Sequence, residues 1–229
     1  MKLKTRNIKF TATKSSGEVS GIIILPEEPK FLLLFAHGAG AGMKHPFMEK
    51  VSGYLADEGI GTLRYNFPYT EKQKKGPDPA PILMQTIRSA VSAAKKYGRD
   101  IPLLAGGKSM GGRMTSMAAS KEPLDDAKGI VFFGFPLHAP GRPSNERAEH
   151  LFSVNVPMLF LQGTRDKLAD LKLLKPVVKK LKDKAMLHII EGGDHSFHLL
   201  KSAGRDDEEV FKEIAKKVGE WGWEVMQDS

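Results

Sequence analysis

The chain has 229 residues, 41% hydrophobic and 27% charged, which suits one globular domain over residues 1–229 and excludes a disordered chain. It contains no cysteine, which excludes disulfide frameworks, thiolate metal sites and a cysteine nucleophile. The formal net charge is +8, but no nucleic-acid-binding motif accompanies it and no apolar run approaches the ~20 residues of a membrane span, so we expect a soluble, cytoplasmic protein.

Apolar runs and helical patterns alternate along the chain. In chain order, the expected elements are strands at 22–25 and 31–36, a helix with Pro46 in its first turn that ends at Gly59, a strand at 60–67, a helix opened by Pro79 and closed by Gly98, a strand at 101–105, a helix at about 110–120, strands at 130–135 and 158–161, an amphipathic lysine-rich helix between 171 and 184, a strand at 186–190 and a last helix that begins at Asp206. This alternation predicts an α/β fold with a parallel sheet and helices on both faces. In such sheets ligands bind at the loops beyond the carboxyl ends of the strands.

A G-x-S-x-G sequence, Gly107-Lys108-Ser109-Met110-Gly111, lies between a predicted strand and a predicted helix. This context is typical of a nucleophile elbow, in which a sharp turn lifts the serine hydroxyl above the sheet. The alternative is that Ser109 only caps the helix and that the glycines only allow a tight turn.

A serine hydroxyl needs a general base to accept its proton. We expect His195, which lies in a glycine-containing loop directly after the strand at 186–190. His198 is the near alternative, but we expect it to be entering the following helix already.

The base needs a carboxylate that fixes its tautomer. Asp166 follows the strand at 158–161 and is the predicted acid, although it could instead cap the helix that follows. Asp170 is a rival, and Asp194 is too close to His195 in sequence to orient it easily. The order serine, aspartate, histidine is the order found in α/β-hydrolases.

Two backbone N–H groups are candidates for an oxyanion hole. One belongs to Met110, directly after the predicted nucleophile, and the other to Ala39, in the small-residue loop at 37–42. We expect His37 to shape this loop rather than to act as a base.

The residues in and near this loop do not form a metal-binding or cofactor-binding motif, so we expect no metal and no cofactor. His37 and His45 lack acidic partners at metal-ligand spacing, and the glycines match neither G-x-x-x-x-G-K-[ST] nor G-x-G-x-x-G.

Five residues around the predicted nucleophile are candidates for binding substrate: His37, Gly38, Lys108, Leu137 and His138. Lys108 and Arg113 could recognise an anionic substrate, but pairing with nearby acids is the favoured interpretation. His138 could contact substrate or have a structural role.

Five segments carry a family resemblance: HGAG (37–40), GGKSMGGR (106–113), FPLHAPG (135–141), QGTRD (162–166) and DHS (194–196). The chain resembles small α/β-hydrolases of the dienelactone-hydrolase-like kind, in the branch that includes a testis-expressed protein and a chromatin acetyltransferase complex subunit. The resemblance implies a mainly parallel eight-stranded sheet with an antiparallel second strand, and a Ser–Asp–His triad. It departs from true dienelactone hydrolases, whose nucleophile is cysteine.

The expected function is therefore hydrolysis of a small-molecule carboxylic ester through an acyl-enzyme, with minimal or no cap domain, no nucleic-acid partner and no membrane partner. A thioesterase or amidase would use the same three residues. A peptidase is less favoured, because the sequence indicates no second domain that would position a peptide. An inactive binding or scaffold protein would keep the fold without the activity.

Overall fold

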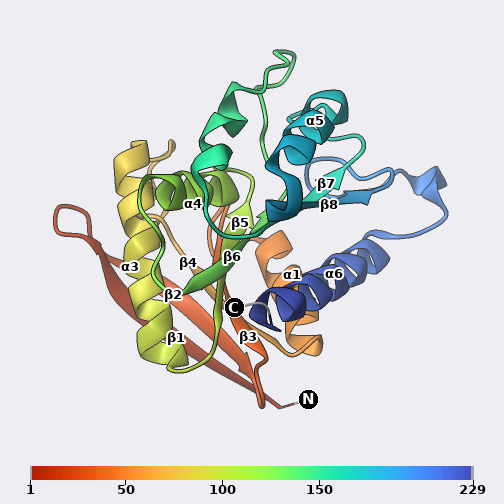
Figure 1. Cartoon of the computed structure of the whole chain (residues 1–229). Coiled ribbons are helices and arrows are strands. Elements are labelled where there is room, and N and C mark those ends of the chain that lie inside the picture. Colours follow the sequence, from red (N-terminus) through yellow and green to blue (C-terminus); the bar gives the residue numbers. More distant parts are fainter. Residues whose placement is uncertain (1, 228–229) are drawn as a thin grey trace.

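The computed structural model describes residues 2–227; Met1, Asp228 and Ser229, which the expected domain includes, lie outside the described residues. One eight-stranded sheet runs through it in the order β1-β2-β4-β3-β5-β6-β7-β8 (Figure 1). Antiparallel pairing joins β1 to β2 and β2 to β4, and every other neighbouring pair is parallel. This sheet confirms the expected α/β class and the antiparallel second strand.

The strands have the following bounds: β1 Leu3–Thr13, β2 Gly17–Pro26, β3 Phe31–Ala36, β4 Ile60–Tyr65, β5 Leu103–Lys108, β6 Ala127–Phe133, β7 Met158–Gly163 and β8 Ala185–Ile190. Those in the middle of the sheet are buried along their whole length, as continuous apolar runs require when helices cover both faces.

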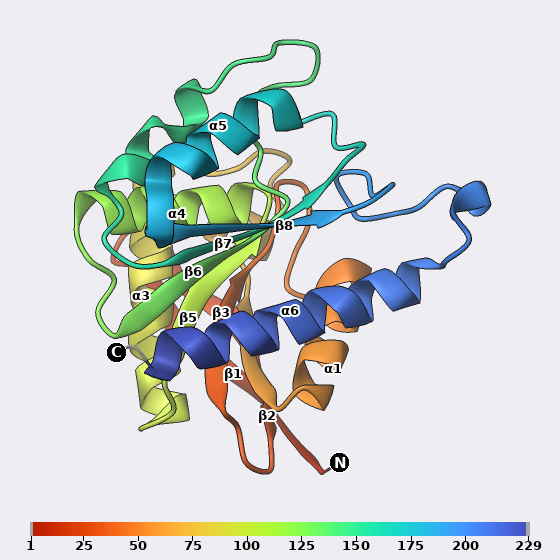
Figure 2. The same cartoon turned by 45° about the vertical axis from the view of Figure 1, so that its right-hand side comes forward.

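The described residues also form six α-helices and three 3₁₀ helices, of which the last two follow β8: α1 Pro46–Asp57, α2 Pro68–Glu71, α3 Ala80–Gly98, α4 Met110–Lys121, η1 Glu146–Ser153, α5 Leu171–Leu181, η2 Lys182–Lys184, η3 Lys201–Ala203 and α6 Asp207–Gln227. Helices α1 and α6 pack on one face of the sheet, whereas α3, α4 and α5 pack on the other (Figure 2). Among the described residues, no helix combines the length and the apolarity needed to cross a bilayer.

Alternate residues of one strand divide the core into layers. In β3, Phe31, Leu33 and Phe35 pack with α1 and α6, whereas Leu32 and Leu34 pack with α3. This two-sided burial is the physical reason that the strand reads as an unbroken apolar run.

Several bounds differ from the expected ones: β2 begins at Gly17 rather than at 22, β4 ends at Tyr65 rather than at 67, and β6 covers 127–133 rather than 130–135. The short helices α2 and η1 were not expected.

The structure also differs from the expected elements in three further places. The N-terminal strand β1 was not expected, because only Ile8 and Ala12 of its eleven residues are buried. The strand expected at 101–105 runs from Leu103 to Lys108, so the two glycines before Ser109 are still paired to neighbouring strands. The last helix begins one residue later than expected, at Asp207.

The sheet topology determines where a site can form. From β3 the chain crosses to β4 on one side, and β5 is added on the other side of β3. Loops that leave β3 and β5 at their carboxyl ends therefore diverge and leave a crevice, which is where open α/β sheets bind ligands. The segments that follow these two strands are residues 37–42 and the Ser109 turn.

Candidate active site

Ser109 occupies a sharp turn between β5 and α4. Its φ is +51°, a left-handed conformation that is strained for a residue with a side chain. The turn packs closely on the end of β3: a Cβ atom added at Gly107 or Gly111 would lie 2.5 Å from the backbone oxygen of Ala36. Glycines at these two positions therefore allow the strained serine to stand at the carboxyl edge of the sheet.

His195 lies within hydrogen-bonding distance of both other residues of the predicted triad. Its Nε2 is 2.8 Å from Ser109 Oγ, and its Nδ1 is 2.7 Å from Asp166 Oδ2. Because an ionised carboxylate can only accept, Nδ1 carries the proton that it donates to Asp166. The lone pair on Nε2 is then free to accept the Ser109 hydroxyl proton.

Asp166 is held rigidly beneath the imidazole. Its side chain is completely buried, and besides His195 it accepts hydrogen bonds from Gln162 Nε2 and from the backbone N–H of Leu168. The residue that caps α5 is Asp170, whose carboxylate accepts the N–H of Lys172 at 2.8 Å. Asp166 thus contacts His195, whereas its rival Asp170 caps α5.

His198 and Asp194, which were weighed as base and acid, contact groups outside the triad. His198 was expected to enter a helix, but it lies in the irregular segment before η3, where its Nδ1 is 2.6 Å from Asp207 Oδ2. Asp194 accepts the N–H groups of Ser196 and His198 and so shapes the turn that carries His195.

The glycine-rich loop after β3 packs directly against the serine turn. A Cβ atom added at Gly38 would lie 3.6 Å from Ser109 Cβ. Met110 is the first residue of α4, and the first N–H groups of a helix have no partner within it. Ala39 lines the same cleft as Ser109, and Met110 directly follows Ser109, so both residues predicted for an oxyanion hole lie near the serine.

His37 is buried beneath this loop and serves its backbone. Its Nδ1 donates to the oxygen of Gly38 at 2.8 Å, and its Nε2 accepts the N–H of Phe67 at 3.2 Å. Burial lowers the pKa of His37 to about 4, so the ring is neutral at pH 7 and keeps this tautomer. These contacts agree with the expectation that His37 shapes the loop.

A cleft of about 300 Å³ opens in front of Ser109 and His195. Gly38 and Lys108 of the five expected substrate-binding residues line it, as does Ala39 of the predicted oxyanion hole. Six further lining residues were not expected from the sequence: Ala41, His45, Phe47, Met48, Leu168 and Ser196. Ala41, His45, Phe47 and Met48 lie in the glycine-rich loop or soon after it. Their position beyond the carboxyl end of β3 could have identified them from the sequence.

Three of the expected substrate-binding residues do not line the cleft. His37 and Leu137 are fully buried, and His138 is 5% exposed. His138 Nδ1 donates to the oxygen of Ala139, and its Nε2 accepts the N–H of Asp170, both at 2.9 Å. The structure therefore gives His138 the structural one of its two expected roles.

Lys108 and Arg113, the two cations beside Ser109, have different surroundings. Lys108 Nζ donates to the backbone oxygen of His195 at 2.6 Å. Burial lowers the pKa of Lys108 to about 8, although the nearby carboxylates of Asp166 and Asp194 raise it. Neither cation forms an ion pair within 4.0 Å in the described part of the chain. For Lys108 the expected acid pairing is seen only as this longer-range attraction, whereas burial lowers the pKa of Arg113 and a nearby cation, Arg147, lowers it further.

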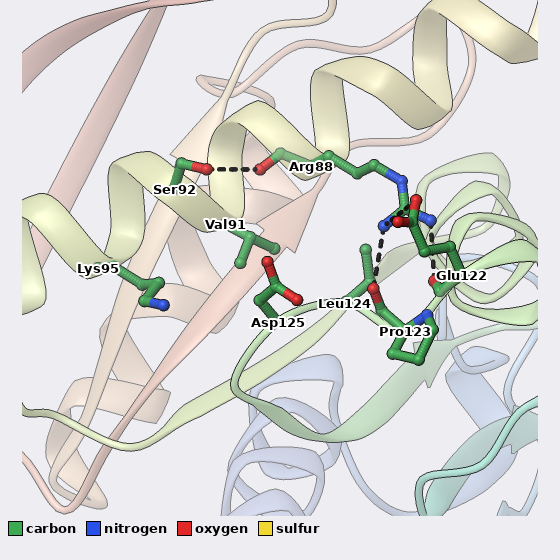
Figure 3. A pocket seen from close by; sticks show the side chains of 8 residues that line it. All are labelled: Arg88, Val91, Ser92, Lys95, Glu122, Pro123, Leu124 and Asp125. Atoms are coloured by element: carbon green, nitrogen blue, oxygen red, sulfur yellow. Dashed lines mark hydrogen bonds and ion pairs between the residues drawn. The ribbon is translucent and has the colours of Figure 1, made fainter.

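A more voluminous hollow, of about 430 Å³, lies at the other end of α4 (Figure 3). Figure 3 shows Arg88 reaching from α3 to Glu122 and Pro123, and its guanidinium donates to three backbone oxygens at the end of α4. Arg88 is thus used to hold the helix end, and the hollow has no nucleophile paired with a base. Within residues 2–227, no group of three or more His, Asp or Glu side chains is arranged to hold a metal ion.

Comparison with protein families gives one match over most of the chain. A family model described as an alpha/beta hydrolase domain matches residues 29–222. A curated protein of Mycobacterium tuberculosis (strain H37Rv), provisionally named a phosphoribosyl transferase, is 24% identical over 207 residues. The match covers 89% of this chain but only 43% of that protein, so this chain spans less than half the length of that relative.

Solved structures show the same fold over nearly the whole chain. A dienelactone hydrolase from Anabaena variabilis superposes with a TM-score of 0.74 at 18% identity, covering 96% of this chain and 97% of that one. A serine hydrolase without a lid from Xanthomonas campestris superposes with a TM-score of 0.72 at 17% identity and 95% coverage of both chains. Est1E from Butyrivibrio proteoclasticus has a TM-score of 0.71 at 16% identity, covering 96% and 99%. The narrower resemblance to the testis-expressed and chromatin-complex branch remains a prediction.

Proposed function

Because the chain belongs to the alpha/beta hydrolase domain family, we propose that it is a serine hydrolase that cleaves carboxylic esters or related acyl bonds. The observation that carries this proposal is the hydrogen-bonded series from Ser109 through His195 to Asp166, with distances of 2.8 and 2.7 Å, at the mouth of a cleft.

The proposed reaction passes through an acyl-enzyme. His195 Nε2 accepts the proton of Ser109 while the serine oxygen attacks the carbonyl carbon. Asp166 stabilises the resulting imidazolium, and the N–H groups of Ala39 and Met110 hold the developing oxyanion. His195 then protonates the leaving alcohol and afterwards activates a water molecule, which releases the acid and regenerates Ser109.

The shape and lining of the cleft favour a small substrate with an apolar group. Its volume of about 300 Å³ lies at the lower end of the range usual for ligand pockets. Phe47, Met48 and Leu168 line it beside the reacting groups. We therefore propose short-chain esters as the first substrates to test, with thioesters and amides as comparisons because the same triad would serve them.

The name of the mycobacterial relative suggests phosphoribosyl transfer, and the site favours hydrolysis instead. This chain corresponds to 43% of that relative. In this chain, a serine is paired with a histidine and an aspartate. Such a group activates the serine as a nucleophile for acyl transfer.

The test is covalent labelling with a fluorophosphonate, followed by intact-mass measurement. The unmodified protein should gain one adduct, and Ser109→Ala should gain none. Ser196→Ala is the matched control, because Ser196 also lines the cleft but has no base paired with it, and its labelling should match the unmodified protein. Well-folded protein that fails to label, or an adduct that persists in Ser109→Ala, would contradict the proposal.

A further inference from the structure

Lys108 is a charged side chain buried within the apolar core beneath the site. It is the last residue of β5 and is 8% exposed. Side chains alternate between the faces of a strand, so Lys108 points to the same face as Leu104, the face that α1 and α6 cover. A lysine in such a place needs a specific partner, because an ammonium is costly to bury.

The partner is the backbone of the residue proposed as the base. Lys108 Nζ donates to the oxygen of His195 at 2.6 Å and lies 5.7 Å from the ring centroids of both Phe47 and Phe197. A Cβ atom added at Gly134 would lie 3.1 Å from Nζ, so the backbone directly after β6 also approaches the amine closely. These contacts therefore hold the ammonium beside the backbone oxygen of His195.

The other contacts of the His195 loop hold the imidazole or the neighbouring residues rather than the backbone oxygen of His195. The imidazole bonds Asp166 and Ser109, and the buried ring of Phe197 stacks on Phe47. The oxygen of Gly193 accepts the N–H of Arg165 at 2.9 Å, which joins the start of the loop to β7. Asp194 accepts N–H groups of Ser196 and of His198, but these bonds lie within the loop. The bond from Lys108 links the backbone oxygen of His195 to β5, whose last residue directly precedes Ser109.

We propose that Lys108 is a positioning residue of the triad, whose buried ammonium holds the backbone of His195 so that the imidazole stays over Ser109. This inference rests on the proposed serine-hydrolase function. A misplacement of about 1 Å between reacting groups can lower a rate by about 10²-fold. Because Lys108 adjoins the nucleophile and its amine holds the base, one side chain sets their separation.

The protonation state of Lys108 gives the inference a pH signature. The carboxylates of Asp166 and Asp194 and the residue His195 lie near its amine, α1 contributes the ring of Phe47, and Gly134 lies directly after the end of β6. Burial lowers the pKa of Lys108 to about 8. Above that pH the charge-assisted hydrogen bond becomes an ordinary one, so activity should decline partially on the alkaline side.

The absence of cysteine makes a direct test possible. Lys108→Cys creates a unique thiol, which can be alkylated in denaturant with 2-bromoethylamine or with 1-bromopropane before refolding. The two products have the same length and differ in whether they end in an amine or a methyl group. Unmodified protein taken through the same cycle controls for refolding, and circular dichroism and urea unfolding report the fold of each product.

We expect the S-propyl protein to lose kcat by about 10²-fold, with little change in KM, and to react correspondingly more slowly with the fluorophosphonate. The S-aminoethyl protein should recover most of both rates. Its alkaline decline should move to lower pH, because the sulfur makes the amine less basic, and the S-propyl protein should show no such decline. Equal rates for the two products, whether high or low, would overturn the inference.

Hydrogen exchange separates this inference from the proposed function. In the folded S-propyl protein, the amides of residues 193–198 should exchange faster than in the S-aminoethyl protein, whether or not the enzyme turns over ester. Lys108→Met serves the same comparison against unmodified protein if the S-propyl product does not refold. Equal exchange in the folded proteins overturns the role of Lys108, whereas absent labelling of the unmodified protein overturns the function.

Discussion

Replacing Asp166 with asparagine keeps the size of the side chain and removes its charge. The carboxylate accepts three hydrogen bonds: from His195 Nδ1, from Gln162 Nε2 and from the N–H of Leu168. An amide has one oxygen and one NH₂ group, so it cannot accept all three. In one orientation the new NH₂ group faces the N–H of Leu168, donor against donor. In the other it faces the donors of His195 and Gln162.

The second orientation reverses the tautomer of His195. With an NH₂ group facing Nδ1, the proton resides on Nε2, and the ring can no longer accept the proton of Ser109. In serine proteases this substitution costs about 10⁴ in kcat, which corresponds to about 5.4 kcal/mol of transition-state stabilisation. We expect a loss of the same order here, with KM little changed, because Asp166 does not line the cleft. One buried donor also loses its partner, which should lower the free energy of unfolding by about 1–3 kcal/mol.

The assay is kcat for a short-chain nitrophenyl ester, measured with protein shown to be folded by urea unfolding. Asp170→Asn is the matched control: asparagine is as good a cap as aspartate, so α5 should keep its N-terminus and kcat should stay within about twofold. Most of the activity retained in Asp166→Asn, or an equal loss in Asp170→Asn, would contradict the orienting role of Asp166.

Two further predictions concern stability. Gly106→Ala should prevent folding or lower the free energy of unfolding by more than about 4 kcal/mol, because the new Cβ would lie 2.1 Å from the backbone oxygen of Val131. Gly53→Ala, where nothing lies within 4 Å of the new Cβ, should instead stabilise helix α1 by about 0.5–1 kcal/mol. Urea unfolding measures both variants. Burial lowers the pKa of His37 and of His150 to about 4, below the unfolded value of 6.5. The unfolded chain therefore binds more protons between pH 6.5 and 4, and the free energy of unfolding should fall on acidification by up to about 1.4 kcal/mol per pH unit for each histidine. His150→Gln should reduce that slope, and an equal slope in this variant would contradict the assignment.

Continuous apolar runs made most of the fold predictable. Strands such as β3 and β7 are covered on both faces, so nearly every residue is apolar or small and each run ends at a loop. Apolar runs also pointed to Ser109, Asp166 and His195, because each follows a predicted strand within a few residues. The strands β5 and β7 are buried throughout, whereas β8, which precedes His195, is only partly buried. Parallel strands bring their carboxyl ends to one edge, so three separate positions in the sequence become neighbours.

Strand β1 could not be predicted in this way because its stability comes from its partner. It pairs with β2 over residues 3–13 and exposes most of its side chains, so it lacks the apolar run of a central strand. The exact end of β5 was also missed. Glycines usually weaken a strand, yet here the neighbouring backbones lie too close to admit a side chain at Gly106 or Gly107.

For three polar residues near Ser109, position in a motif did not predict what the side chain contacts. His37, Lys108 and His138 were all candidates for contacting substrate, since each lies at the carboxyl end of a strand or just beyond it. In the structure each one binds loop backbone: His37 donates to Gly38 and Lys108 to His195. His138 joins two loops by donating to Ala139 and accepting from Asp170.

Buried backbone groups are the physical reason that polar side chains occupy these places. Loops that carry reacting groups must have their backbone groups buried beside the cleft, and a buried carbonyl or N–H without a partner costs about 1–3 kcal/mol. A histidine can donate and accept at once, and a lysine can reach a carbonyl from the core, so either can satisfy a loop and fix it in place. Proximity to Ser109 therefore favours support of the loops as much as contact with substrate. Only the direction of each side chain, which depends on strand pairing distant in sequence, distinguishes the two roles.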